Sequence, residues 1–300
     1  MSVPRFVSYL RLEKNYSVHT VNAYEKDILS FVAFCADEHG FSGIDNVEYP
    51  IVRSWVVALV NSGISNRSVN RKVAALKAYY GFLQQIGVVE TNPLAKHKAL
   101  KTSKKIEVPF SEDEMRAVLS QLPFAEGFEG RRDKLIIELL YTTGIRRAEL
   151  VNIKVGDVDL GGRSLKVLGK RNKERVVPLL LPTVELFRSY LPLRDSLENI
   201  VGTEFVFLTN TGNKIYETLV YRIINKYFRE VSSKVKRSPH ILRHTFATHL
   251  LNNGADLNSV KELLGHSSLA STQVYTHNSI SELKKIHESA HPRGKKSQRR

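Results

Sequence analysis

Apolar residues recur at three- and four-residue steps along most of the chain, which is the spacing of one buried face of an α-helix. Before residue 90 this pattern divides into four helical segments, predicted at about residues 2–13, 17–40, 50–62 and 65–86. A glycine stands at or just after the end of the last three segments, where helices commonly stop. The pattern therefore predicts a four-helix N-terminal domain over residues 1–92.

After residue 92 the apolar periodicity stops and lysines accumulate, so residues 93–110 are predicted to form a basic linker. A second domain, residues 111–291, opens with Ser111 and Glu114 in the spacing of a helix capping box. Helices are predicted at about residues 111–121, 130–142, 183–191, 216–233, 240–252, 256–264 and 279–289, and strands at residues 165–168, 175–179 and 205–208. Residues 292–300 are predicted to be a disordered basic tail. The predicted fold class is mainly α: an all-helical domain joined to a mostly helical domain with a small antiparallel β-sheet.

Charge narrows the class of partner. Lysine and arginine number 45 against 30 aspartates and glutamates, giving a formal net charge of +15 that is spread along the whole chain. Such an excess is typical of a protein that binds a polyanion such as double-stranded DNA, and a merely basic surface is the less favoured explanation. The single cysteine, Cys35, lies in an apolar run and is predicted to be a core residue. Since no signal peptide and no apolar run of about 20 residues is found, we expect a soluble cytoplasmic protein with no membrane partner.

Three cations stand at the start of the helix predicted at residues 65–86. Arg67, Arg71 and Lys72 occupy its first two turns, where the helix dipole favours acidic side chains instead. This placement suggests an anion outside the helix, although a solvated face is an equally good explanation. Two further cations, Arg171 and Lys173, lie in the polar turn between the first two predicted strands. All five are candidate contacts to DNA.

The last third of the chain, together with two segments upstream of it, carries the residue types that phosphodiester cleavage needs. Arginines hold the non-bridging oxygens of the phosphate, a general acid protonates the leaving 5′ oxygen, and a tyrosine stores the bond energy as an aryl phosphate. Histidines exchange protons. The candidates are Arg146, Lys170, His240, Arg243, His266 and Tyr275.

Spacing supports a common pocket for several of these candidates. His240 and Arg243 are three residues apart after Pro239, so they share one face near a helix N-terminus, which favours a phosphate. Lys170 lies on the turn between two strands, from which it can reach a phosphate as the general acid. Taken singly, each residue has an ordinary structural explanation. A zinc helix built on His240 and His244 is disfavoured, because Ile241 stands where a zinc-protease helix has its catalytic glutamate; no metal and no cofactor is predicted.

In this order the motifs resemble those of the tyrosine recombinase (phage integrase) family, and within it the Xer-type site-specific recombinases. Thr-Gly-Ile-Arg-Arg-Ala-Glu-Leu is similar to the family's first arginine box and assigns that role to Arg146, with Glu149 as structural support. The hairpin Gly-Lys-Arg-Asn-Lys-Glu-Arg is similar to its lysine motif and assigns Lys170. His-Ile-Leu-Arg-His, Leu-Gly-His-Ser and Val-Tyr-Thr-His are similar to the motifs that complete its site. One departure is Arg171, where the family usually has glycine, which changes the hairpin's geometry or adds a phosphate contact.

The resemblance covers nearly the whole chain and implies the rest of the function. It implies a SAM-like core-binding domain, two protomers clamped on each DNA core site, and a tetrameric synapse. Tyr275 is expected to form a 3′-phosphotyrosyl bond on the way to a Holliday junction, without metal or ATP. A second Xer recombinase and a DNA translocase are expected partners. The helix after Tyr275, with Leu283 and Ile286 on one face, is expected to pack on a neighbouring protomer, with packing on its own chain as the alternative.

Several functions remain open at this point. Within the family, resolution of chromosome dimers competes with integration or excision of a mobile element. The core-binding-like helices begin almost at residue 1, which leaves no room for an added arm-binding domain and favours the first. A type IB topoisomerase shares the tyrosine chemistry, and a purely DNA-binding regulator would need none of it.

Overall fold

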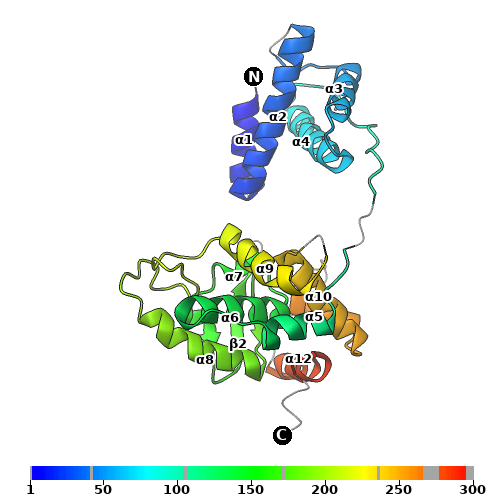
Figure 1. Ribbon diagram of the computed structural model, residues 1–300. Helices are drawn as coiled ribbons and strands as arrows, with labels where there is room; N and C mark the ends of the chain where they lie inside the picture. The colour runs from blue at the N-terminus through cyan, green and yellow to red at the C-terminus, as the bar shows by residue number, and fades with distance from the viewer. Residues whose placement is uncertain are drawn as a thin grey trace. The chain divides into compact units, whose positions relative to one another are not determined.

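The computed structural model describes residues 2–40, 43–103, 107–169, 173–234, 237–265 and 277–294, without the side chains of residues 277–280. The chain divides into two compact units, Met1–Lys105 and Ile106–Arg300, which can be followed separately in Figure 1. Within the described ranges, no helix is long and apolar enough to cross a bilayer.

The first unit is a bundle of four helices: α1 (Val3–Leu12), α2 (Val18–His39), α3 (Tyr49–Asn61) and α4 (Asn66–Gln85). All four were predicted from periodicity, and their ends fall within a residue or so of the predicted ones. Ser17 and Ser65 cap α2 and α4 by accepting hydrogen bonds from backbone N–H groups of the first turn. The buried core is almost wholly apolar, with Phe31 and Trp55 in ring contact at 4.9 Å between centroids.

The start of the predicted basic linker is attached to the first unit. The side-chain oxygen of Asn70 accepts from the backbone N–H of Leu100, and its amide nitrogen donates to the Leu100 carbonyl, both at 2.9 Å. Asn66 donates to the carbonyl of Lys101 at 2.8 Å. The chain therefore stays bonded to α4 for most of the first half of the predicted linker, residues 93–110.

The second unit is built around α6. Its helices and helical turns are α5 (Glu112–Arg116), the π-helical turn Ala117–Gln121, α6 (Gly127–Thr143), α7 (Arg147–Leu150), the 3-10 turn Val155–Asp157, α8 (Leu181–Asp195), α9 (Glu217–Val231), α10 (Pro239–Asn252), α11 (Leu257–Leu264) and α12 (His277–Ala290). Helix α6 packs against α8, α9 and α10. Ser111 and Glu114 form the predicted capping box at the start of α5. These elements confirm the predicted mostly helical second domain.

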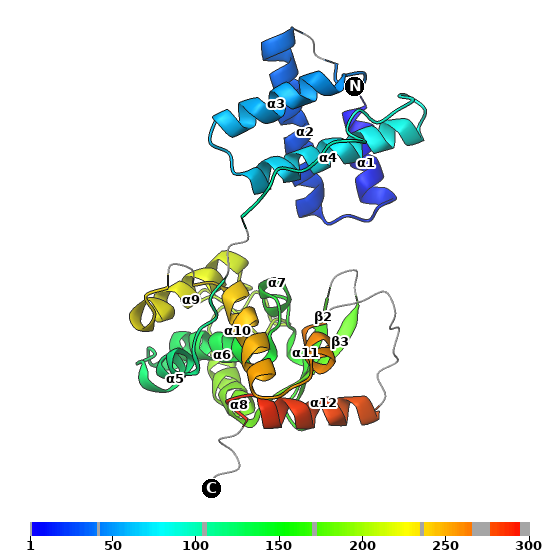
Figure 2. The ribbon, with the colours of Figure 1, turned by 90° about the vertical axis from the view of Figure 1, so that its right-hand side faces the viewer.

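A small antiparallel sheet completes the second unit, in the order β1 (Val158–Asp159), β2 (Ser164–Leu168), β3 (Glu174–Pro178). In the β2–β3 hairpin, Leu165 pairs with Val177 and Leu168 with Glu174. The sheet itself and the β2–β3 hairpin were predicted. Figure 2 shows this hairpin beside α11 and above α12.

The third predicted strand, residues 205–208, was wrong. This segment forms only single bridges, Lys154 with Phe205 and Leu208 with Lys214, and the third strand is β1. Its backbone bonds to irregular segments on both sides, such as Val206 N–H to the carbonyl of Ile153 at 2.9 Å. The run is apolar because most of its side chains are buried in the core, and a short apolar run does not by itself distinguish a strand from a buried loop.

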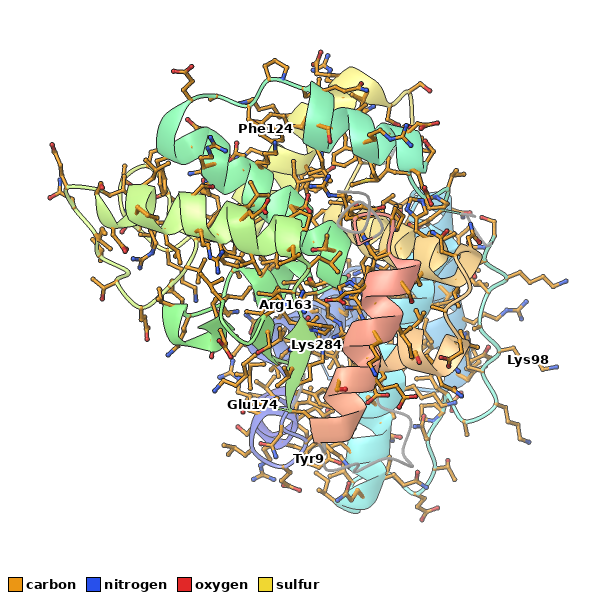
Figure 3. The ribbon with its side chains drawn as sticks, turned by 90° about the horizontal axis from the view of Figure 1, so that it is seen from below. Tyr9, Lys98, Phe124, Arg163, Glu174 and Lys284 are labelled. Atoms are coloured by element: carbon orange, nitrogen blue, oxygen red, sulfur yellow. The ribbon has the colours of Figure 1, made fainter. Side chains whose placement is uncertain are left out.

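The C-terminal helix α12 packs on its own unit, which corrects the expectation that its apolar face lies on a neighbouring protomer. Leu283 is buried in a cluster with residues of α10 and α11, and Ile286 packs against the same cluster. The opposite edge of α12 bonds to the turn before β2, where Glu288 pairs with Arg163 at 2.8 Å. Figure 3 shows Lys284 of α12 close to Arg163. The apolar face of α12 is thus covered within one chain.

The predicted disordered tail also begins too early. Arg293, the second residue of the predicted tail 292–300, donates from its Nε to Glu138 of α6 at 2.9 Å. The backbone N–H of Gly294 donates to His291 at 2.9 Å. Since Glu138 is fully buried, this bond fixes Arg293 against α6. Residues 295–300 lie outside the described residues.

Candidate active site

A cavity of about 410 Å³ opens where α7, α9 and α10 meet. Its lining gathers three of the six predicted catalytic residues from segments almost a hundred residues apart. The lining residues are Arg146, Arg147, Ala148, Glu217, Tyr221, Ser238, Pro239, His240 and Arg243.

Arg146 enters this cavity from the turn between α6 and α7. Helix α6 ends at Gly144, whose φ of 60° lies in the left-handed region and whose added Cβ would come within 2.4 Å of the Phe246 ring. Only glycine fits there, which explains the Thr-Gly of the motif. Arg146 follows two residues after this glycine. Its backbone N–H and its guanidinium both donate to Glu149, each at 2.8 Å. The Arg146 side chain remains one-third exposed and lines the cavity.

Glu149 is held from a second direction by an arginine that the sequence reasoning did not single out. Arg175 of β3 donates two hydrogen bonds to the Glu149 carboxylate, at 3.0 and 2.8 Å. Burial acts to raise the pKa of Glu149, but the hydrogen bonds and charge of Arg175, together with the donors of Arg146, outweigh it and lower the pKa. Glu149 is therefore ionised at neutral pH, and it was correctly interpreted as support for Arg146.

Arg243 enters the cavity from α10 and is almost fully buried. Its guanidinium donates to the backbone carbonyl of Gly144 and, at 2.7 Å, to that of Leu264. Burial, followed by the positive charge of Arg146, lowers the pKa of Arg243 to about 10, so it stays protonated at neutral pH. Two like charges held near each other favour an anion between them, and a phosphate diester supplies one.

His240 lies at the start of α10, on the rim of the cavity. Ser238 caps the helix by accepting from the backbone N–H of Ile241, and Pro239 occupies the first turn, as predicted. The imidazole of His240 is largely exposed and stands 3.5 Å from a carboxylate oxygen of Glu107. The cavity therefore faces the positive end of a helix dipole as well as three arginines, of which Arg147 pairs with Glu217.

Four predicted residues lie outside the described ones: Lys170, Arg171, His266 and Tyr275. Gly169, which precedes Lys170, and Gly265, which precedes His266, are described. The hairpin closes with the backbone N–H of Gly169 donating to Lys173 at 2.8 Å, and α11 ends directly before Gly265.

The candidate DNA contacts differ from one another in their surroundings. Arg71 and Lys72 both bind the buried carboxylate of Asp27, with Lys72 Nζ at 3.2 Å and Arg71 through two bonds. Arg67 is exposed and makes no ion pair with any residue of the described ranges, and Lys173 is exposed at the end of the hairpin. The role of all four in DNA binding stays a prediction. The sequence did offer a sign of the ion pair, because Asp27 interrupts the apolar face of its helix.

A cavity lined by Arg146, Arg147 and Arg243 at a helix N-terminus, in a basic protein, is typical of a phosphate-binding site in a protein that acts on nucleic acid. Residues 111–282 match the phage integrase family, and residues 3–87 match the N-terminal SAM-like domain of phage integrases. The chain therefore belongs to the phage integrase family, as its motifs predicted, and it is a tyrosine recombinase, an enzyme that cuts and rejoins DNA.

Relatives of similar length agree with this assignment. The chain is 40% identical over 294 residues to tyrosine recombinase XerC of Oceanobacillus iheyensis, which covers 97% of this chain and 96% of the relative. It is 38% identical over 312 residues to tyrosine recombinase XerC of Chlorobaculum parvum, covering 96% and 93%.

Solved structures share the fold. The integrase of the Tn1549 transposon, in complex with transposon right end DNA, superposes with a TM-score of 0.73 at 21% identity and covers 95% of this chain and 99% of its own. XerH site-specific recombinase bound to palindromic difH substrate gives a TM-score of 0.68 at 20% identity, covering 94% and 83%.

Proposed function

We propose that this enzyme is a site-specific recombinase of the Xer type, and that it resolves chromosome dimers in the cytoplasm. The observation that carries the proposal is the match to proteins named tyrosine recombinase XerC, which extends over 96% or more of this chain in the relatives above. The cavity that holds Arg146 and Arg243 supports it, because both arginines are fixed by hydrogen bonds before any substrate arrives.

In the proposed reaction, Arg146 and Arg243 bind the non-bridging oxygens of the scissile phosphate. The phenolic oxygen of Tyr275 attacks the phosphorus and forms a 3′-phosphotyrosyl bond, while the bond to the 5′ oxygen breaks. Lys170 gives that leaving oxygen its proton, and His240 and His266 exchange protons with the reacting groups. The 5′ hydroxyl of a partner strand then attacks the phosphotyrosyl bond, and tyrosine leaves. No step calls for a metal or a nucleotide cofactor.

Strand exchange of this kind yields a Holliday junction and needs four active sites. We infer that two protomers bind the two halves of a double-stranded DNA core site and that two such sites form a tetrameric synapse. A second Xer recombinase and a DNA translocase are the further partners of this proposal. Integration or excision of a mobile element is the alternative use of the same chemistry, and the transposon integrase shares the fold.

Covalent capture tests the proposal. The protein is mixed with fragmented DNA of its source genome and denatured, and the protein-linked fragments are sequenced, with Tyr275→Phe as the control. We expect enrichment of one short inverted-repeat site, lost in Tyr275→Phe although that variant still binds DNA. A site near the replication terminus supports dimer resolution, and a site at the boundary of a mobile element supports integration. Scattered capture points to topoisomerase-like action, and capture by Tyr275→Phe would refute the nucleophile.

The arginines are tested on the captured site. Arg146→Ala and Arg243→Ala should each slow cleavage on the order of 10²-fold or more, because each stabilises charge that develops in the transition state. DNA affinity should change far less. Cleavage at the wild-type rate by either variant would remove that arginine from the proposed site.

A further inference from the structure

Arg175 is a buried cation that binds the same carboxylate as Arg146 and that the proposed reaction does not use. Its side chain is 6% exposed, and both terminal nitrogens of its guanidinium donate hydrogen bonds to the Glu149 carboxylate. Replacing a buried ion pair with apolar residues of similar volume is often neutral or stabilising, so such a pair is a weak device for stability. Arg175 therefore needs an explanation beyond packing.

The hydrogen bonds around Glu149 suggest one. Its Oε1 accepts from the guanidinium of Arg146 and from Arg175, and its Oε2 accepts from the backbone N–H of Arg146 and again from Arg175. Two of the four bonds hold Arg146, and the other two come from Arg175 on the sheet. Without Arg175, the carboxylate would be held only by the residue that it has to orient.

Arg175 also contacts two segments that lead into other residues of the proposed site. A Cβ on Gly265 would lie 2.9 Å from both Cδ and Nε of Arg175, so the end of α11 rests directly on this side chain. A Cβ on Gly169 would lie 3.5 Å from Arg175 Nη1, which places the start of the hairpin turn against the guanidinium as well. Glycine is needed at Gly265, since its φ is 66° and a side chain there would collide.

The Arg175 side chain therefore bonds to Glu149 and lies next to Gly169 and Gly265, while Arg146 shares the same carboxylate. Gly169 precedes Lys170 in the sequence, and Gly265 precedes His266. The next arginine inward, Arg243, binds the carbonyl of Leu264 at the same end of α11. Arg175 lies where the hairpin, the first arginine box and the end of α11 converge.

We propose that Arg175 is a positioning residue of this recombinase: it fixes the Glu149 carboxylate so that Arg146 is held in the geometry that binds the scissile phosphate. It acts through Glu149 and contacts no substrate. This inference rests on the role of Arg146 proposed above. A displacement of about 1 Å in a group of this kind can cost about 10²-fold in rate, so the effect is expected in cleavage and not in DNA affinity.

A double-mutant cycle tests the proposal on a nicked DNA duplex that carries the captured site, with cleavage measured in a single turnover at saturating protein. Arg175→Ala should slow cleavage by about 10- to 100-fold with DNA affinity nearly unchanged. In the Arg146→Ala background, the same change should have an effect of less than about threefold, because residues that act as one unit are not additive. If the double variant is slowed by the product of the two single-variant factors, the proposal is overturned. Wild-type cleavage by Arg175→Ala would overturn it as well.

Two further variants separate positioning from folding. Arg175→Lys keeps the charge that Glu149 needs but loses the two-pronged geometry, so it should fold and still cleave at least about tenfold slower; wild-type cleavage by this variant would refute the proposal even if Arg175→Ala does not fold. Arg194→Ala is the matched control, because Arg194 is as buried as Arg175 but donates to the carbonyls of Thr203 and Phe205 and to the carboxylate of Asp195, and makes no bond to Glu149. It should lower the melting temperature without slowing cleavage below that temperature; if it slows cleavage as much as Arg175→Ala, the effect is one of folding. If Arg146→Ala itself cleaves normally, the proposed site fails, and the inference fails with it for that separate reason.

Discussion

The two units of this protein use buried charge in opposite ways. Among the described residues of the first unit, Asp27 is the one buried aspartate, glutamate, lysine, arginine or histidine. The second unit buries charged or titratable side chains in every layer around α6, including Arg132, Glu138, Glu149, Arg175, Arg194, Arg243, His249, His287 and His291. Amphipathic helices suffice to assemble a binding scaffold, whereas a phosphate site requires charges held in fixed places at a cost in stability.

A closer comparison sets Asp27 against Glu149, since each is a buried carboxylate bound by two cations. At Asp27 the partner Arg71 is half exposed, so water reaches the pair. At Glu149 the partner Arg175 is only 6% exposed, so water cannot reach its guanidinium to replace a hydrogen bond that a mutation removes. The same pattern of charges should therefore tolerate mutation in the first unit and not in the second.

The largest effect is expected at Glu149. Glu149→Ala leaves Arg175 buried without a counter-charge, which should lower the free energy of unfolding of the second unit by about 3–5 kcal/mol. Denaturant unfolding, followed by circular dichroism, measures this, with Glu149→Gln as the milder control that keeps one acceptor. A loss below about 1 kcal/mol would mean that water solvates the guanidinium of Arg175 in the variant. The charged groups around Glu149 and around Asp27 would then respond to mutation in the same way.

A smaller loss is expected at Asp27. Asp27→Asn keeps the size of the side chain and removes its charge, and its partners can turn to solvent, so the free energy of unfolding should fall by about 1–2 kcal/mol. Cleavage at saturating DNA should not change. Equal destabilisation of this variant and Glu149→Ala would contradict the difference between the two buried carboxylates. Slower cleavage by a folded Asp27→Asn variant would also contradict it.

The same contrast explains what the sequence could predict. The four helices of the first unit followed from periodicity because their buried faces are apolar, so hydrophobic pattern and structure coincide. In the second unit the arginine box, the second box and the hairpin were recognised because their residue types match a chemistry. The pattern missed what depends on tertiary contacts. Arg175 reads as the first residue of a predicted strand, next to a basic turn, and residues 205–208 read as a strand because they form a short apolar run. Nothing local to Arg175 reveals that Glu149, 26 residues away, lies against it.

Buried histidines distinguish the units in their response to pH. His287 of α12 donates to the backbone carbonyl of Thr142 at 2.6 Å and lies beside Phe246 and His291. The backbone N–H of Arg293, whose side chain pairs with the buried Glu138, donates to the His291 ring at 3.1 Å. Burial lowers the pKa of His287 to about 4 and holds that of His291 well below its usual range. Because an unfolded histidine titrates near 6.5, the unfolded state binds protons first as the pH falls, and stability is lost between about pH 6.5 and 4.

At pH 5.5 this linkage should reduce the stability of the second unit by about 1 kcal/mol per such histidine relative to pH 7.5. Thermal melting of wild type and His287→Gln at both pH values measures it. The drop should be smaller in His287→Gln, whose amide donates to the same carbonyl without titrating. Equal drops in the two proteins would show that His287 does not carry the pH dependence.

The smallest effect is expected on the surface of the first unit, where Arg67 and Arg71 differ in their partners. Arg67 is exposed and has no ion pair among the described residues, whereas Arg71 binds Asp27. If Arg67 contacts a DNA phosphate, Arg67→Ala should reduce the slope of log affinity against log salt by about 0.9. Arg71→Ala should change that slope less, because the charge of Arg71 is already partly neutralised by a carboxylate. Titration of labelled core-site DNA at several salt concentrations gives both slopes. An equal reduction in the two variants would mean that DNA competes successfully with Asp27 for Arg71, and the buried carboxylate of the first unit would then serve to position a DNA contact, as Glu149 is proposed to position Arg146.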